Sequence, residues 1–202
     1  MFLFSSFVRI YGLILVAILL FQVSDKPAPY PVSQEAVASS DAGAVSLVIW
    51  TDRAKYSLGD GIKVNAALQN EGDETVYIDR RIFWGGLGGG LKLGIMDEHG
   101  KDLPARLALS DAPMPPPKEG DTSFLIRLEP GYLYGTYVFL KSQDFFPKSG
   151  KYALRVAYGS SLLKETVAPE FRNLPVLWAH SPIIESKPIW ITVTAKGRNV
   201  KR

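Results

Sequence analysis

Apolar and polar side chains alternate along most of the chain after residue 44, and this period of two constrains the fold more than any other feature. In the segment 62–70, Ile62, Val64, Ala66 and Leu68 fall on one side, whereas Lys63 and Asn65 fall on the other. Such alternation is typical of β-strands with one buried face. The pattern recurs in segments 45–52, 75–80, 91–97, 122–130, 132–140, 151–159 and 189–195.

The segments between these strands contain turn residues rather than helices. Glycine occurs in each of the segments 58–61, 98–101, 130–131 and 148–150, accompanied in some by aspartate, proline or serine, and these residues favour tight turns. No amphipathic helix pattern follows residue 43, so there is nothing to form the crossovers of a parallel sheet. Residues 44–196 are therefore predicted to form an all-β fold, an antiparallel β-sandwich of about eight strands, with a closed barrel as the alternative.

The N-terminal residues 1–23 have the composition of a signal peptide or an N-terminal membrane anchor. Arg9 precedes an apolar run of 14 residues, 10–23. A secretory apolar region has about 7–15 residues and a spanning helix needs about 20, so both interpretations stay open. In either case the positive charge before the run predicts export of the domain. We expect a periplasmic or cell-surface location, with residues 10–23 holding the chain in the inner membrane if they are not removed.

Composition defines two flanking segments and excludes some chemistry. Residues 24–43 are rich in proline, alanine and serine and are predicted to be a flexible tether. Residues 197–202 form a basic tail, but the net charge is only +3 and the other charges are mixed, so we expect no nucleic-acid binding. The chain has no cysteine, which excludes disulfides, a thiolate nucleophile and zinc held by cysteine.

The order of turns and strands resembles bacterial immunoglobulin-like domains. The resemblance begins with Tyr56, the turn at 59–61 and Asn70 in "AKYSLGDGIKVNAALQNEGDETVYI". It continues through "LKLGIMDEHGKDL", "IRLEPGYLYGTYVFL" and "GKYALRVAYG", and it covers roughly residues 45 to 195. The same order is similar to the BsuPI-type proteinase-inhibitor-like domain. The resemblance implies an immunoglobulin-like sandwich, in which Tyr152 would fix a corner through its hydroxyl group.

The glycine-rich stretch between Gly85 and Gly90 is not expected to bind a nucleotide. The spacing lacks the third glycine of a dinucleotide fingerprint and the G-K-[ST] of a P-loop, and residues 91–97 alternate like a strand rather than a helix. Glycines accept positive φ at little cost, so a bulge or a crossing between sheets is the favoured interpretation. A minority alternative is that Phe83, Trp84 and the glycine backbone form a contact surface for a peptide or a sugar.

The long segment 160–188 is the other feature that lies outside the strand pattern. A segment of this length is either an elaborated loop or contains a further short strand. Its apolar side chains are expected to cover an open end of the sandwich, and the alternative is a patch for a partner. The candidate binding residues are in this segment and near the glycines: Phe83, Trp84, Phe171, Trp178 and His180.

No combination of residues in the sequence indicates catalysis. His180 and Ser181 are adjacent, but neighbouring residues of an extended segment point apart, and there is no nucleophile elbow. The acidic turns at 70–74 and 96–102 lack the ligand order of an EF-hand, so no metal or other cofactor is expected. The aromatic residues of 132–140 are expected to pack, with a sugar-stacking platform as the alternative.

These observations predict a non-catalytic binding domain, exported or membrane-tethered, that recognises a protein or a cell-envelope polymer through its end loops. One alternative is an inhibitor or accessory subunit of a hydrolase, with the proline-rich segment 111–118 occupying a cleft. The third is a hydrolase that uses acidic residues, because the separation of two carboxylates is decided only by the fold.

Overall fold

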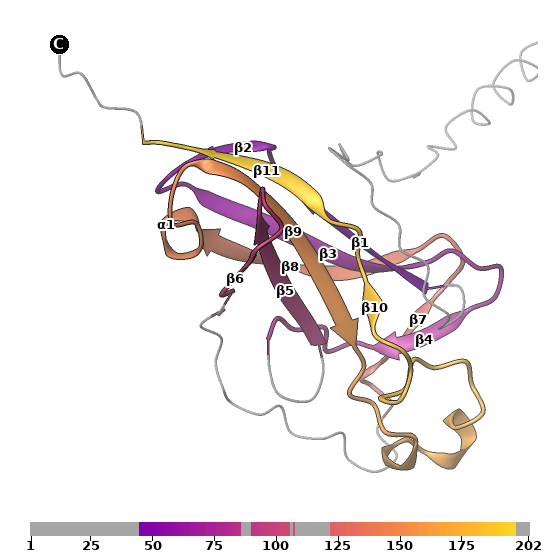
Figure 1. Cartoon of the computed structure of the whole chain (residues 1–202). Coiled ribbons are helices and arrows are strands. Elements are labelled where there is room, and N and C mark those ends of the chain that lie inside the picture. Colours follow the sequence, from indigo (N-terminus) through magenta and orange to yellow (C-terminus); the bar gives the residue numbers. More distant parts are fainter. Residues whose placement is uncertain (1–44, 86–89, 106, 108–121, 197–202) are drawn as a thin grey trace, which may run out of the picture. The chain divides into compact units, whose positions relative to one another are not determined.

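The structure, a computed structural model, describes residues 45–85, 90–105, 107 and 122–196. The described part is mostly β-strand, which confirms the all-β class (Figure 1). The predicted membrane segment, the tether, the segment 111–118 and the basic tail lie outside these residues. Among the described residues, no helix is both long and apolar enough to span a membrane.

All eight predicted strands are present, with small shifts at their ends. They are β1 (Val45–Thr51), β3 (Gly61–Asn70), β4 (Val76–Asp79), β5 (Gly90–Asp97), β7 (Leu125–Leu128), β8 (Leu133–Lys141), β9 (Gly150–Gly159) and β11 (Ile189–Thr194). Two short strands were not predicted, because two or three residues carry no readable alternation: β2 (Lys55–Ser57) and β6 (Asp102–Leu103). A third, β10 (Ile184–Glu185), is the further short strand that the sequence left open within segment 160–188. One short helix, α1 (Ser142–Phe145), directly follows β8.

The strands form three sheets. One has the order β1-β3-β8, the second has the order β2-β11-β9-β5-β6 with β10 also pairing with β9, and the third pairs β4 with β7. All these pairings are antiparallel except that of β2 with β11. Antiparallel neighbours are what strands joined by turns, without crossover helices, are expected to form.

The alternation in the sequence decides which side chains are buried. In β3, Ile62, Val64, Ala66 and Leu68 are completely buried, as the period of two predicts. A single cluster of buried apolar residues includes members of β1 and β3 together with members of β5, β9 and β11. Apolar side chains from the two larger sheets therefore share one core, whose burial is the main source of stability for such a domain.

Glycine is required at two positions where backbone segments approach each other closely. Gly135 of β8 lies opposite Ala67 of β3, and a Cβ at this position would overlap the Ala66 carbonyl oxygen. At Gly90, where φ is 95°, a Cβ would come within 2.6 Å of the Phe83 carbonyl oxygen. Both positions accept only glycine without a shift of the backbone.

The segment 160–188 is an elaborated loop with short elements. It contains the 3₁₀ turns η1 (Lys164–Thr166) and η2 (Pro169–Phe171), then strand β10, and Val176 forms an isolated bridge with Tyr77. Figure 1 shows the loop beside β4 and β7, at the end of the sheets away from α1. Its apolar residues form a second small core with Phe124, centred on Leu162, Val167 and Val176. The prediction that the apolar side chains of this loop pack is confirmed for those in this second core, whereas Leu163 and Ile183 are exposed.

Candidate functional site

The ends of the glycine-rich segment are closed against each other. Leu91 donates a backbone hydrogen bond of 2.7 Å to Phe83, and Gly85 donates one of 2.7 Å to Leu91. Gly85 has a φ of 72°, so both flanking glycines that are described use the left-handed region. The segment is followed directly by strand β5, which begins at Gly90. A phosphate-binding loop instead leads into the N-terminus of a helix.

Trp84, a predicted binding residue, is buried in the main core. Its side chain is 6% exposed, and its indole nitrogen has no hydrogen-bond partner among the described residues. Phe83 is half-buried beside it. The Trp84 backbone forms an isolated bridge with Leu91, and both side chains belong to the main buried apolar cluster. In this conformation the Trp84 ring does not present a contact surface, and of the two aromatic residues in that alternative only Phe83 is partly exposed.

The other predicted binding residues are in the long loop. Phe171 and Trp178 are half-buried and pack against the second core, and His180 is exposed. The Ser181 hydroxyl accepts a hydrogen bond of 3.1 Å from the Trp178 backbone, so this serine belongs to a turn. The loop thus brings Phe171 and Trp178 to one cluster, separately from Phe83 and Trp84. Whether these residues bind a partner stays a prediction.

The acidic turns organise the backbone. Asn70 is completely buried, and its amide group donates to the carbonyl oxygens of Glu74 at 2.7 Å and Leu128 at 2.9 Å. The Asp97 carboxylate accepts backbone hydrogen bonds from His99 and Lys101, both at 2.9 Å. The Lys101 amide, above all, lowers the pKa of Asp97. Among the described residues, no group of three or more histidine, aspartate or glutamate side chains is placed to hold a metal ion.

A buried carboxylate is present where the sequence analysis did not look for one. Asp79, at the end of β4, is 3% exposed and accepts hydrogen bonds of 2.9 and 2.7 Å from the two guanidinium nitrogens Nε and Nη2 of Arg81. The Ser161 hydroxyl lies 3.5 Å from the same carboxylate. Burial first, and then the Asp79 charge, raises the pKa of Tyr158. The arrangement is a closed ion pair, which fixes β4 rather than exposing a reactive group.

The most prominent exposed feature is on β8, where packing was expected. Tyr137 and Phe139 are 52% and 65% exposed, and Leu133 shares their face of the strand. Opposite them in the register, Asn65 faces Tyr137 and Lys63 faces Phe139. The alternation "LYGTYVFLK" predicts two faces but not which one is buried, because both carry aromatic residues. The expectation that all the aromatic residues of 132–140 pack is wrong for Tyr132, Tyr137 and Phe139.

The two exposed rings do not form a flat platform. Their centroids are 5.4 Å apart and their planes are inclined at 76°, an edge-to-face contact. The Lys63 ammonium lies 4.2 Å from the centre of the Tyr137 ring, a cation–π geometry. One face of Tyr137 is therefore occupied by a cation. This geometry disfavours sugar stacking on these two rings and leaves an apolar, weakly positive surface.

Strand β8 also has a free edge within the described residues. Its nine residues pair with β3 on one side, and β7, the strand before it, pairs instead with β4. No proline interrupts the strand. An edge of this length presents unpaired backbone donors and acceptors that another extended chain can use.

Comparisons with known proteins do not extend these observations. Neither the models of known families nor the curated proteins give a match to this chain.

Proposed function

We propose that the folded part is an immunoglobulin-like β-sandwich whose layers are β1-β3-β8 and β2-β11-β9-β5-β6. Three observations support this assignment. The two sheets share one core, β2 runs parallel to β11 at a sheet edge, and Tyr152 hydrogen bonds to the Lys148 backbone as a corner tyrosine does. A domain of this kind is a rigid scaffold that presents surfaces for binding, and its fold alone implies no activity.

The function that we propose is recognition of a partner protein without catalysis. The domain is held on the exported side of a membrane, or released there, according to the fate of residues 1–23. The single observation that carries the recognition surface is the exposed row Leu133, Tyr137 and Phe139 on β8. Aromatic side chains beside a free edge provide both apolar area and an orientation for an incoming strand.

The mode of binding that best fits this surface is addition of a strand. An extended segment of the partner would hydrogen bond to the free edge of β8, and its alternate side chains would contact Tyr137, Phe139 and Lys63. Main-chain hydrogen bonds supply affinity in such complexes and the side-chain contacts supply specificity. The positive charge of Lys63 favours a partner segment that carries an acidic side chain at the neighbouring position.

This proposal moves the contact surface from the end loops to the β8 face. Phe171, Trp178 and His180 remain candidates at the end of the sheets, because they are at least partly exposed. Trp84 is a weaker candidate since its ring is buried. The inhibitor alternative depends on segment 111–118, which lies outside the described residues.

The test uses a photo-activated crosslinking amino acid at position 139 in the full chain, expressed in its own cell envelope. We expect one dominant crosslinked partner, and loss of that product when Tyr137→Ser is added. The same crosslinker at position 163 is the control, because Leu163 is 42% exposed but lies in the long loop. Equal crosslinking from both positions, or no effect of Tyr137→Ser, contradicts the proposal.

A second readout separates binding from folding. Phe139→Ser and Tyr137→Ser change exposed side chains, so the melting temperature is expected to stay within a few degrees of the original. If the crosslinked partner is a second copy of the chain, sedimentation will show a dimer that the same two changes dissociate. That result would make β8 a self-association edge rather than a site for another protein.

A further inference from the structure

A second surface with the properties of a ligand site lies on the other large sheet. A shallow pocket of about 410 Å³ opens where β2, β11 and β9 lie side by side, and its lining residues are Ala54, Lys55, Glu98, Lys151, Trp190, Ile191 and Thr192. Its volume is in the range of small-molecule sites. None of these residues belongs to β8, and none is used by the proposed recognition surface.

The strand register places three polar side chains in one row across the pocket. Thr192 of β11 is the neighbour of Lys55 on one side and of Lys151 on the other. Residues opposite each other in paired strands share a face of the sheet, and adjacent strands are about 4.8 Å apart. The two ammonium groups are thus carried by strands about 10 Å apart, on either side of a threonine hydroxyl.

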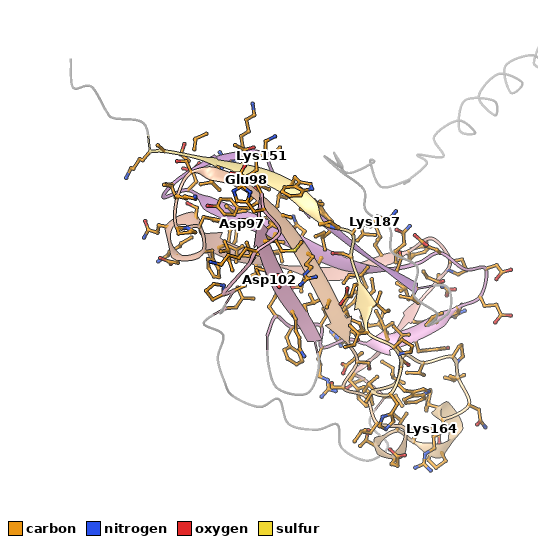
Figure 2. The ribbon with its side chains drawn as sticks, in the orientation of Figure 1. Asp97, Glu98, Asp102, Lys151, Lys164 and Lys187 are labelled. Carbon is orange, nitrogen blue, oxygen red and sulfur yellow. The ribbon has the colours of Figure 1, made fainter. Side chains whose placement is uncertain are left out.

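The two lysines are free to bind a ligand. No ion pair among the described residues includes Lys55 or Lys151. Glu98 is also on the rim, and Figure 2 shows it beside Lys151. Its carboxylate lies 3.9 Å from the His99 imidazole, an ion pair only when the histidine is protonated. Two positive charges and one negative charge leave the rim with a single net positive charge, which suits a ligand with one negative charge better than a polyanion.

The pocket is also lined by an exposed tryptophan. Trp190 lies two residues before Thr192 on the same face of β11 and is 47% exposed. It lies opposite Ala153 of β9, which is completely buried. An aromatic face carries partial negative charge. It therefore attracts the slightly positive C–H groups on the apolar side of a sugar ring, while the sugar hydroxyls stay available to polar groups.

We propose that this pocket binds a sugar that carries one carboxylate, such as a uronic acid residue of an envelope polysaccharide. The sugar ring stacks on Trp190, and its carboxylate is placed between Lys55 and Lys151. The Thr192 hydroxyl donates hydrogen bonds to the sugar hydroxyls or accepts them, and the Glu98 carboxylate only accepts them. A phosphodiester chain fits less well because Glu98 repels successive negative charges.

The experiment measures binding of cellobiouronic acid, a disaccharide of glucuronic acid and glucose with a single carboxylate, to the full chain by isothermal titration calorimetry. A neutral disaccharide of the same size, lactose, tests the carboxylate, and N-acetyl-alanyl-alanine tests whether any carboxylate is sufficient. We expect millimolar or tighter binding of the acidic disaccharide, and at least tenfold weaker binding of both other probes. A rise in salt is expected to weaken binding because the rim charges are exposed.

Variants test each contact. Trp190→Ala and Lys151→Gln are each expected to weaken binding at least fivefold, and Trp190→Phe is expected to restore part of the loss because it keeps an aromatic face. Lys164→Gln is the matched control, since Figure 2 shows Lys164 at the opposite end from Lys151. Thermal melting checks that each variant is folded.

Two results would overturn the site. One is the absence of binding to the acidic disaccharide at ten millimolar, and the other is binding that Trp190→Ala and Lys151→Gln leave unchanged. Preference for the peptide would replace the sugar by a peptide carboxylate and also contradicts the proposal. Tyr137→Ser and Phe139→Ser must leave sugar binding intact, so failure of the β8 surface and failure of this pocket are distinguishable.

Discussion

The Tyr152 hydroxyl donates a hydrogen bond of 2.7 Å to the carbonyl oxygen of Lys148, four residues earlier in the chain. The Tyr152 ring is buried and packs against Phe146, with 4.7 Å between the ring centres. This contact fixes the turn that leads from α1 into β9. Since β9 pairs with β5, β10 and β11, the corner sets the position of the central strand of its sheet.

Removal of the Tyr152 hydroxyl is expected to weaken the fold modestly. Tyr152→Phe keeps the ring in place and leaves the Lys148 carbonyl without this donor. The loss should be about 0.5 to 1.5 kcal/mol in the free energy of unfolding, measured by urea denaturation. Tyr132→Phe is the control, because Tyr132 is exposed and should show no change. Equal losses for the two variants would mean that the corner contact adds nothing.

Loss of the Asn70 amide should be more damaging. Its side chain also accepts a hydrogen bond of 3.0 Å from the Gly72 backbone, so Asn70→Ala removes three hydrogen bonds from a completely buried position. We expect about 2 to 4 kcal/mol of destabilisation, since buried backbone groups lose their partners. Asn65→Ala, which removes one weak bond of 3.3 Å to Trp50, should cost less than about 1 kcal/mol.

The glycine in β8 is expected to be indispensable for pairing with β3. In Gly135→Ala the added methyl group would meet the Ala66 carbonyl oxygen and lie 2.6 Å from the Ala67 Cα atom. The strands must separate, at a cost of about 1 to 3 kcal/mol or more. Gly159→Ala in β9 is the matched control, because a methyl group added there would have open space within 4 Å. Thermal melting of both variants gives the comparison, and a neutral Gly135→Ala contradicts the close approach.

The ion pair of Asp79 and Arg81 should be worth more than an exposed pair. Arg81→Met leaves the buried Asp79 carboxylate without its guanidinium partner, and about 2 to 4 kcal/mol should be lost. Arg127→Gln breaks an exposed contact of 2.8 Å with Glu129 and is expected to cost less than about 1 kcal/mol. Chemical denaturation at pH 7 measures both. Similar values would indicate that water reaches the Asp79 carboxylate.

Alkaline unfolding should report on Tyr56. Burial, followed by its 2.6 Å hydrogen bond to Asp52, raises the pKa of Tyr56 from 10.0 to about 12. Because the folded state holds the phenol proton more tightly, this contribution to stability is complete below pH 10 and is lost between pH 10 and about 12. Tyr56→Phe should flatten the fall in melting temperature over that window. An unchanged slope would assign the alkaline loss to Tyr152 and Tyr158, whose pKa values are also raised.

The strands could be predicted because their signal is local. In β3, apolar residues recur at every second position from Ile62 to Leu68, and the structure buries all four of them, together with Ala67 between Ala66 and Leu68. The short strand β2 gave no such signal, since three residues contain too little of the pattern. Its parallel pairing with β11 depends on where the chain is held by the rest of the sheet.

The candidate sites were harder to predict because exposure is not a local property. Trp84 has the composition of a contact residue, yet the bridge to Leu91 directs it into the core. Tyr137 and Phe139 look equivalent to Tyr134 in the sequence, yet only Tyr134 belongs to the side of β8 that packs on the core. The pocket at Trp190 combines residues from separate segments, which no spacing in the sequence connects.

The sequence by itself determined the all-β class, the strand positions and the turns, because these follow from side-chain alternation and from the backbone preferences of glycine and proline. The tertiary structure alone decided which aromatic residues face solvent, which strand edge is free, and that Lys55, Thr192 and Lys151 lie in one row. The physical reason is that burial and charge proximity depend on pairing between distant strands. That pairing is fixed by the shared core as a whole and by no single segment.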